Sequence, residues 1–108
     1  MTPSEIAAEL LELTQENRKG VEALYEAETN LARAELDLDK TEASAFIQAS
    51  GSVAERQAQA KLDAAEARFQ RDVAKAQTNR IRTKIRAIES EIMAHATMAK
   101  IMQAEMRL

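Results

Sequence analysis

Leucines and small residues recur at heptad spacing along the first half of the chain. One series of positions, each seven residues after the last, is Leu10, Asn17, Leu24, Leu31, Leu38 and Ala45. A second series begins three residues later and consists of Leu13, Gly20, Ala27, Ala34 and Thr41. In a heptad repeat both series face a partner helix. Because one series is large and the other is small, we expect the partner helix to approach closely.

The second half of the chain has a similar apolar pattern with one irregularity. Its series consists of Leu62, Phe69, Val73, Ile81, Ile85, Ile88, Ile92, His95, Ala99, Met102 and Met106. From Ile81 onward the spacing is three or four residues, but the phase slips between Val73 and Ile81. An insertion of four residues in the repeat produces such a slip and locally unwinds a supercoil. We therefore expect a second long helix with an irregular segment before Ile81.

Residues that begin or end helices occur at two places in the sequence. Thr2 suits the N-cap position and Pro3 the first turn of a helix. Gly51 suits the left-handed conformation that often follows a helix, and Ser52 with Glu55 has the spacing of a capping box. The chain is therefore predicted to turn once, around Gly51.

These boundaries predict one all-α domain over residues 1–108, with a helix over 3–49, a turn over 50–52 and a helix over 53–107. A connection this short returns the second helix antiparallel to the first, so the expected fold is an antiparallel two-helix coiled-coil hairpin. The composition agrees, because the chain has only 2 Gly, 1 Pro and 3% aromatic residues. A hairpin alone buries little surface, so we expect a homo-oligomer, with a dimeric four-helix bundle favoured over a larger assembly.

Charge is unevenly distributed between the two halves. Residues 1–50 contain 11 acidic and 4 basic residues, and residues 51–108 contain 7 acidic and 11 basic residues, within a net charge of −3. Folding at Gly51 places acidic and basic residues opposite one another. The expected pairs are Glu16 with Arg86, Glu22 with Arg80, Glu28 with Lys75 and Glu35 with Arg68. Each exposed pair contributes about 0 to 1 kcal/mol, so the pairs select the register more than they stabilise the fold.

The basic residues of the second helix also allow a functional interpretation. A stripe at three- and four-residue spacing consists of Arg68, Arg71, Lys75, Asn79, Arg82 and Arg86. A phosphate backbone could follow such a stripe. Apart from Phe69, which belongs to the apolar series, no aromatic residue is placed there to stack on bases. We therefore favour intrachain pairing and keep nucleic-acid binding through Arg68, Arg71, Lys75, Arg82 and Arg86 as the alternative.

The C-terminal segment, AKIMQAEMRL, is expected to lack an intrachain partner. With the pairing described above, residues after Met98 extend past the start of the first helix. The segment concentrates the apolar residues Ile101, Met102, Met106 and Leu108. Exposed apolar patches often mark association surfaces, and methionine adapts to irregular partners. We expect these four residues to bind a partner, with a second copy of the chain favoured over a different protein.

No pattern in the sequence indicates a catalytic, cofactor-binding or metal-binding site. The chain has no cysteine and one histidine, and a helical di-iron site needs a Glu three residues before a His, where Ile92 precedes His95. We therefore expect a binding protein rather than an enzyme. No apolar run approaches the roughly 20 residues that span a bilayer, and no export signal is present, so we expect a cytoplasmic protein that does not enter membranes.

The turn segment GSVAERQAQAKLD, together with the ending AEMRL, resembles small helical-hairpin proteins encoded by bacteriophages and prophages, especially of actinobacteria. The resemblance spans most of the chain. Its specific residues are Gly51, Ser52, Ala54, Glu55 and Arg56 at the turn and Glu105, Arg107 and Leu108 at the end. It implies a phage accessory role in the host cytoplasm, such as an assembly factor, an adaptor or an inhibitor of a host protein, and assigns no functional residue. The secreted WXG hairpin proteins differ, because the turn here is Ser-Gly-Ser with no Trp.

Overall fold

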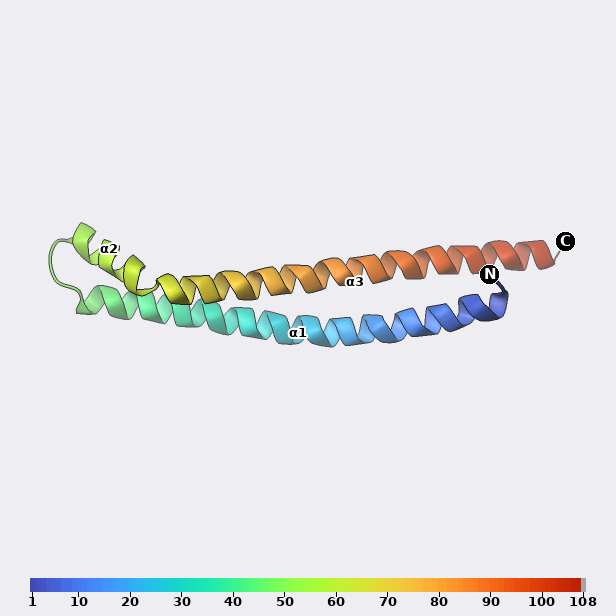
Figure 1. Cartoon of the computed structure of the whole chain (residues 1–108), viewed down its shortest axis with the longest axis horizontal. Coiled ribbons are helices and arrows are strands. Elements are labelled where there is room, and N and C mark those ends of the chain that lie inside the picture. Colours follow the sequence, from blue (N-terminus) through green and yellow to red (C-terminus); the bar gives the residue numbers. More distant parts are fainter. Residues whose placement is uncertain (108) are drawn as a thin grey trace. The chain divides into compact units, whose positions relative to one another are not determined.

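The computed structural model describes residues 1–107 as three α-helices, without a strand among those residues (Figure 1). They are α1 (Pro3–Gln48), α2 (Val53–Asp63) and α3 (Ala65–Met106). The predicted all-α class is confirmed. In the described part of the chain, none of the helices is long and apolar enough to cross a membrane. Contacts divide the chain into unit 1, which combines Met1–Leu24 with the segment from Arg80 onward, and unit 2, which is Tyr25–Asn79.

The helix ends lie where the capping residues predict them. At the start of α1, Thr2 Oγ1 accepts a hydrogen bond from the backbone N–H of Glu5 at 3.2 Å. Gly51 has a φ of 107°, the left-handed conformation that favours glycine. Ser52 Oγ accepts from the backbone N–H of Glu55 at 3.2 Å and donates to the Glu55 carboxylate at 3.1 Å. The capping pair at the turn is therefore reciprocal, although the Glu55 carboxylate accepts from the Ser52 hydroxyl and not from the Ser52 backbone N–H.

The single helix expected over residues 53–107 is two helices separated at Ala64. This residue has φ −91° and ψ 3°, outside the regular helical range. Backbone hydrogen bonding nevertheless continues, from the Ala64 N–H to the Ala60 carbonyl at 3.0 Å and from the Arg68 N–H to the Ala64 carbonyl at 2.9 Å. The break is therefore one residue wide. Neither Gly nor Pro marks it in the sequence.

In unit 2, α1 buries or half-buries the heptad positions predicted for it except Thr41, which is exposed, but α2 and α3 bury a different row. Leu38 of α1 is 6% exposed, whereas Leu62 and Phe69 are 69% and 59% exposed. The buried or half-buried row on α2 and α3 consists of Ala60, Ala64, Ala67, Arg71, Ala74 and Thr78. Small residues in this row allow the close approach that the small series of α1 predicts. The prediction that Leu62 and Phe69 lie in the helix–helix contact, which we name the seam, was therefore wrong.

The predicted phase slip before Ile81 is also absent from the burial pattern. The half-buried or buried residues of α3 in unit 1 are Ile81, Ile85, Ile88, Ile92, His95, Ala99 and Met102. They continue the three- and four-residue spacing of the row that ends at Thr78. The slip was inferred from Leu62, Phe69 and Val73, of which two point to solvent. The buried row that begins at Ala60 keeps an unbroken heptad repeat instead.

The contacts of unit 2 change register between the turn and Thr78. Near the turn, the guanidinium of Arg56 donates to the Phe46 carbonyl, as the expected pairing implies. Further along, the Thr78 hydroxyl lies 3.3 Å from the Ala27 carbonyl oxygen, where the expected register places Lys75. The displacement of three residues arises in the stretch that contains the break at Ala64.

Unit 1 has the same displaced register and a close helix contact at Gly20. A Cβ atom added at Gly20 would lie 3.0 Å from Ile85 Cγ1, whereas the expected register places Arg82 opposite Gly20. Ile85 is 8% exposed, and Ile6 and Leu13 of α1 are 1% and 5% exposed. Gly20 therefore permits close packing against a buried isoleucine, which explains a glycine in the middle of a long helix.

Candidate interaction surfaces

The C-terminal residues predicted to bind a partner do not share one environment. Met102 is half-buried and, with Met106, lines a groove of about 190 Å³ that Pro3, Ile6, Ala7 and Leu10 of α1 also line. The prediction that residues after Met98 extend past the start of the first helix is therefore displaced, because the shifted register brings Met102 alongside Pro3 and the extension begins later in α3. Ile101 and Met106 remain 55% and 76% exposed. Leu108 lies outside the described residues.

Ile101 belongs to a larger exposed surface, which we name the outer face of α3. It consists of Ala87, Ser90, Ala94, Thr97, Ile101 and Ala104, all exposed and all uncharged. Each of these residues follows a residue of the buried row by two positions. At about 100° per residue, two positions turn the side chain to the opposite side of the helix. The outer face therefore points away from the side of α3 that α1 covers in unit 1.

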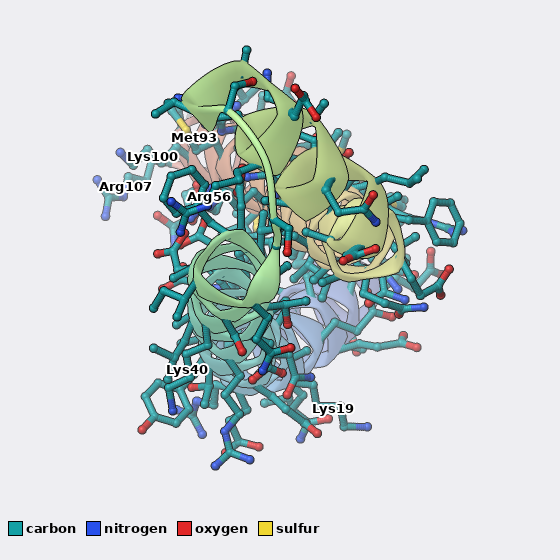
Figure 2. The ribbon with its side chains drawn as sticks, turned by 90° about the vertical axis from the view of Figure 1, so that its left-hand side faces the viewer. Lys19, Lys40, Arg56, Met93, Lys100 and Arg107 are labelled. Carbon is teal, nitrogen blue, oxygen red and sulfur yellow. The ribbon has the colours of Figure 1, made fainter. Side chains whose placement is uncertain are left out.

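Two rows of exposed residues border the outer face of α3. The first row consists of Arg86, Met93, Lys100 and Arg107, and the second consists of Lys84, Glu91, Met98 and Glu105. Met93 and Met98 are 71% and 41% exposed. Figure 2 shows Met93, Lys100 and Arg107 directed to the same side of the molecule, as their spacing of seven residues requires. The first row is thus basic and apolar, and the second is mainly acidic and apolar.

Unit 2 carries exposed apolar side chains of its own. On α1, Tyr25, Leu36 and Ile47 are 76%, 51% and 73% exposed. Their spacing of eleven residues is close to three helical turns, so they lie on one face. Leu62 of α2 and Phe69 of α3 are exposed as well. Unit 2 therefore presents apolar side chains to solvent from both halves of the chain.

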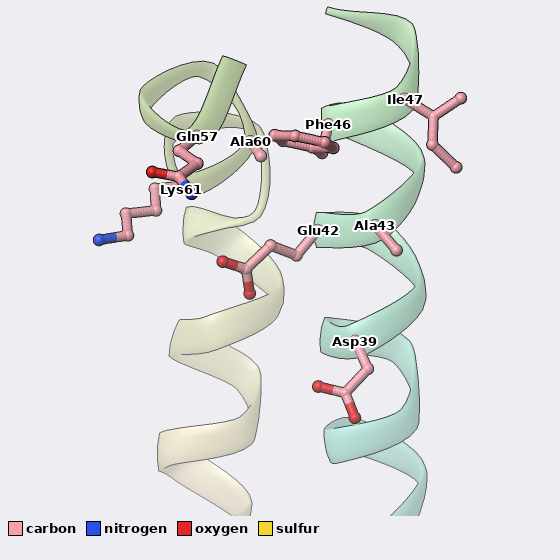
Figure 3. A pocket seen from close by; sticks show the side chains of 8 residues that line it. All are labelled: Asp39, Glu42, Ala43, Phe46, Ile47, Gln57, Ala60 and Lys61. Atoms are coloured by element: carbon pink, nitrogen blue, oxygen red, sulfur yellow. The ribbon is translucent and has the colours of Figure 1, made fainter. Parts of the chain in front are cut away.

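A groove of about 650 Å³ lies in unit 2 beside the turn. It is lined by Asp39, Glu42, Ala43, Phe46, Ile47, Gln57, Ala60 and Lys61. Figure 3 shows the Phe46 ring directed from α1 toward Ala60 of α2, whereas Ile47 points away from α2. Charged residues of both signs border the groove, so it has no single electrostatic character.

Arg56 and Phe46 hold this end of unit 2 together. The Arg56 guanidinium lies 4.3 Å from the centroid of the Phe46 ring. Its Nε and Nη2 atoms donate to the Phe46 carbonyl at 3.2 and 3.0 Å. A carbonyl in the last turn of a helix lacks an intrahelical partner, and Arg56 supplies one. This contact positions α2 against the end of α1, and we assign it a structural role.

The basic residues of unit 2 that were proposed for nucleic-acid binding are mostly engaged. Arg68 Nη1 donates to the Lys61 carbonyl at 3.4 Å. Arg71 lies half-buried in the seam and forms an ion pair with Asp72 at 2.7 Å. Lys75 is exposed. The stripe read from the sequence is therefore not a uniform row of cations facing solvent.

In unit 1, Arg82 has an interaction partner and Arg86 is exposed on α3. The expected ion pairs of Glu16 with Arg86 and of Glu22 with Arg80 are not formed among residues 1–107. The three-residue displacement of register accounts for this, because it moves each acidic residue away from its expected partner. Electrostatic pairing therefore did not set the register in the way the sequence suggested.

Sequence reasoning missed the outer face of α3, the Arg56–Phe46 contact and the buried Thr78. The outer face could have been found from the absence of charge at every third or fourth position from Ala87 to Ala104. Nothing in the residue types alone marks the other two. Within residues 1–107, no group of three His, Cys, Asp or Glu residues could hold a metal ion.

Comparison of the chain with models of protein families, with curated proteins and with solved structures gives no match. The functional interpretation therefore rests on the surfaces described above.

Proposed function

We propose that the chain is an antiparallel helical hairpin that binds another protein chain and performs no catalysis. The contacts within unit 2 support the antiparallel arrangement. Phe46, near the end of α1, meets Arg56 near the start of α2, and Ala27, earlier in α1, meets Thr78 later in α3. Sequence numbers that fall along one arm and rise along the other are the signature of a chain that returns on itself.

The observation that carries the binding role is the distribution of large apolar side chains. Among residues 1–107, the buried ones are Ile6, Leu13, Leu38, Ile85 and Ile88. The exposed ones, more than twice as many, are Met1, Leu11, Val21, Tyr25, Leu36, Ile47, Val53, Leu62, Phe69, Met93, Met98, Ile101 and Met106. The seam is narrow because alanine and glycine fill much of it. Burial of the remaining apolar side chains then needs a second chain.

A second copy of the chain is the first partner we propose. Symmetric dimers are the commonest oligomers, and a second copy presents the same set of exposed apolar side chains to be covered. Two hairpins that cover their exposed apolar faces against each other would form a four-helix assembly. In the phage setting that the sequence resemblance implies, such an assembly would serve as an assembly factor, an adaptor or an inhibitor of a host protein.

Light scattering coupled to size exclusion tests self-association directly. The monomer has a mass of 12.0 kDa, and we expect a mass near twice this value that falls on dilution. The dimer should persist at high salt, because apolar burial is not screened. A mass of 12.0 kDa at every concentration at which the chain stays dissolved would refute self-association.

Nucleic-acid binding through α3 is the alternative, and fewer observations support it. Lys75 and Arg86 are exposed, but Arg68 and Arg71 are engaged within unit 2. A stripe that tracks a phosphate backbone needs several free cations in succession. The salt dependence of oligonucleotide binding separates this alternative from protein binding.

A further inference from the structure

The outer face of α3 has the spacing of a second heptad repeat. Its residues alternate steps of three and four from Ala87 to Ala104, as the buried row does on the opposite side of the helix. A helix with heptad spacing on two opposite sides can pack on α1 with one side and on another helix with the other. Alanine, serine and threonine in this face let a second helix approach closely. Ile101, with 55% of its surface exposed, supplies a large apolar side chain to be covered.

The two rows that border this face are complementary if the second helix is another copy of α3 in parallel orientation. In a parallel coiled coil, the row that precedes the core in one helix lies beside the row that follows it in the next heptad of the other helix. Arg86 then meets Glu91 of the partner subunit, and Lys100 meets Glu105 of the partner subunit. Between these ion pairs, Met93 meets Met98 of the partner subunit.

An antiparallel pairing of the same faces lacks this complementarity. Each row then faces its own copy in the partner, so Arg86 is brought against Arg107 of the partner subunit. The opposite-charge pair of Lys84 with Glu105 of the partner subunit only offsets this repulsion, whereas every charged pair of the parallel arrangement is favourable. Like charges beside a helical seam disfavour that orientation. The pattern of charges therefore favours a second copy of α3, in parallel orientation, as the helix that covers the outer face.

We propose that the outer face of α3 is a parallel, two-fold symmetric interface between two copies of this chain. The inference rests on the proposed function, for which it names the self-association surface. By symmetry, each of the ion pairs and the methionine contact forms twice in one dimer. The outer face lies opposite the row that α1 covers in unit 1, so the hairpin does not have to open for the interface to form.

A single introduced cysteine tests this geometry, because the chain has no cysteine of its own. Ala94 lies in the middle of the outer face, and in a parallel two-fold pair the two thiols of Ala94→Cys face each other. Mild oxidation should link this variant into a disulfide dimer. The matched control is Ala32→Cys, an exposed alanine of α1. We expect the Ala94→Cys dimer to form at least about tenfold faster than that of the control.

Charge reversal gives an independent measurement on the same interface. Arg86→Glu and Glu91→Arg should each weaken the dimer by about tenfold, because each change alters two symmetric ion pairs. The double variant should return the dissociation constant to near that of the wild type, since it restores opposite charges in the parallel arrangement. Additive weakening in the double variant would contradict the parallel pairing.

The possible failures are distinguishable. A wild-type dimer in which Ala94→Cys links no faster than Ala32→Cys places the interface elsewhere, and the inference fails while the proposed function stands. Preferential linkage in a mixture of Ala94→Cys with Thr97→Cys would indicate an antiparallel pair and overturn the inference. A wild-type chain that stays at 12.0 kDa overturns both the inference and self-association.

Discussion

Replacing Ile6 by alanine tests whether the C-terminal part of α3 packs against the start of α1. Ile6 is 1% exposed, although it lies near the beginning of the chain. The substitution removes three carbon atoms, which corresponds to about 2.4 kcal/mol at about 0.8 kcal/mol per buried group. The cavity left behind brings the expected loss to about 2 to 4 kcal/mol. The matched control is Ile47→Ala, the same change in the same helix at a residue that is 73% exposed.

For Ile47→Ala we expect a loss of about 0.6 kcal/mol or less, because only about a quarter of the side chain is buried in the folded chain. Both substitutions gain the same helix propensity, so the difference between them reports burial. Urea titrations followed by far-ultraviolet circular dichroism measure it, at one protein concentration because self-association adds to stability. The midpoint for Ile6→Ala should fall by roughly 1 to 2 M. Equal midpoints for the two variants would mean that the end of α3 does not cover Ile6.

Three further predictions concern the turn, the seam and the basic residues. Gly51→Ala should lower the free energy of unfolding by about 1 to 2 kcal/mol, because the added Cβ would lie 2.6 Å from Glu55 Oε2 at a φ of 107°; a wild-type urea midpoint would contradict the turn. Thr78→Val should cost about 1 kcal/mol in the same assay, because it removes the hydroxyl that donates to the Ala74 carbonyl at 2.8 Å and lies 3.3 Å from the Ala27 carbonyl oxygen, without changing side-chain volume much; a more stable variant would show that these two contacts contribute nothing. If nucleic acid binds along α3, fluorescence anisotropy should show affinity that falls steeply with salt and drops in Arg86→Glu, and no binding at about 50 mM salt removes that alternative.

The first helix could be predicted from the sequence because two signals agree there. The leucine series and the small series have the same heptad phase, and both ends of α1 carry capping residues. The structure accordingly buries Leu38 and Ala27 and ends α1 at Gln48, one residue before the expected position. Where periodicity, residue size and capping all indicate the same face and boundary, a single sequence is sufficient to predict the helix and its buried side.

The buried face of the second half could not be predicted because this half carries apolar residues on two sides. Large side chains such as Leu62 and Phe69 suggested one phase, while Ala60 and Ala64 define the phase that is buried. Hydrophobic periodicity gives most weight to large residues. A close helix contact instead favours small residues. Which of the two sides is buried therefore depends on how closely the helices approach.

The register could not be predicted because it shifts by three residues within the stretch that contains the break at Ala64. Counting outward from Gly51 assumes an uninterrupted helix, which holds as far as Arg56 and Phe46 and fails by Thr78. No helix-breaking residue such as Gly or Pro marks the break in the sequence. The error moved the expected ion pairs by three residues and left the end of the chain without its true neighbours on α1.

The most direct test of the antiparallel hairpin is an intramolecular disulfide between Ala27→Cys and Thr78→Cys in the otherwise cysteine-free chain. The control is Ala27→Cys with Lys75→Cys, which corresponds to the register expected from counting at the turn. At low protein concentration, the first pair should close within one chain, giving an oxidised monomer that migrates faster than its reduced form, and the second pair should close much more slowly. Closure of the Lys75 pair in preference, or linkage of the Thr78 pair only between chains, would contradict the account.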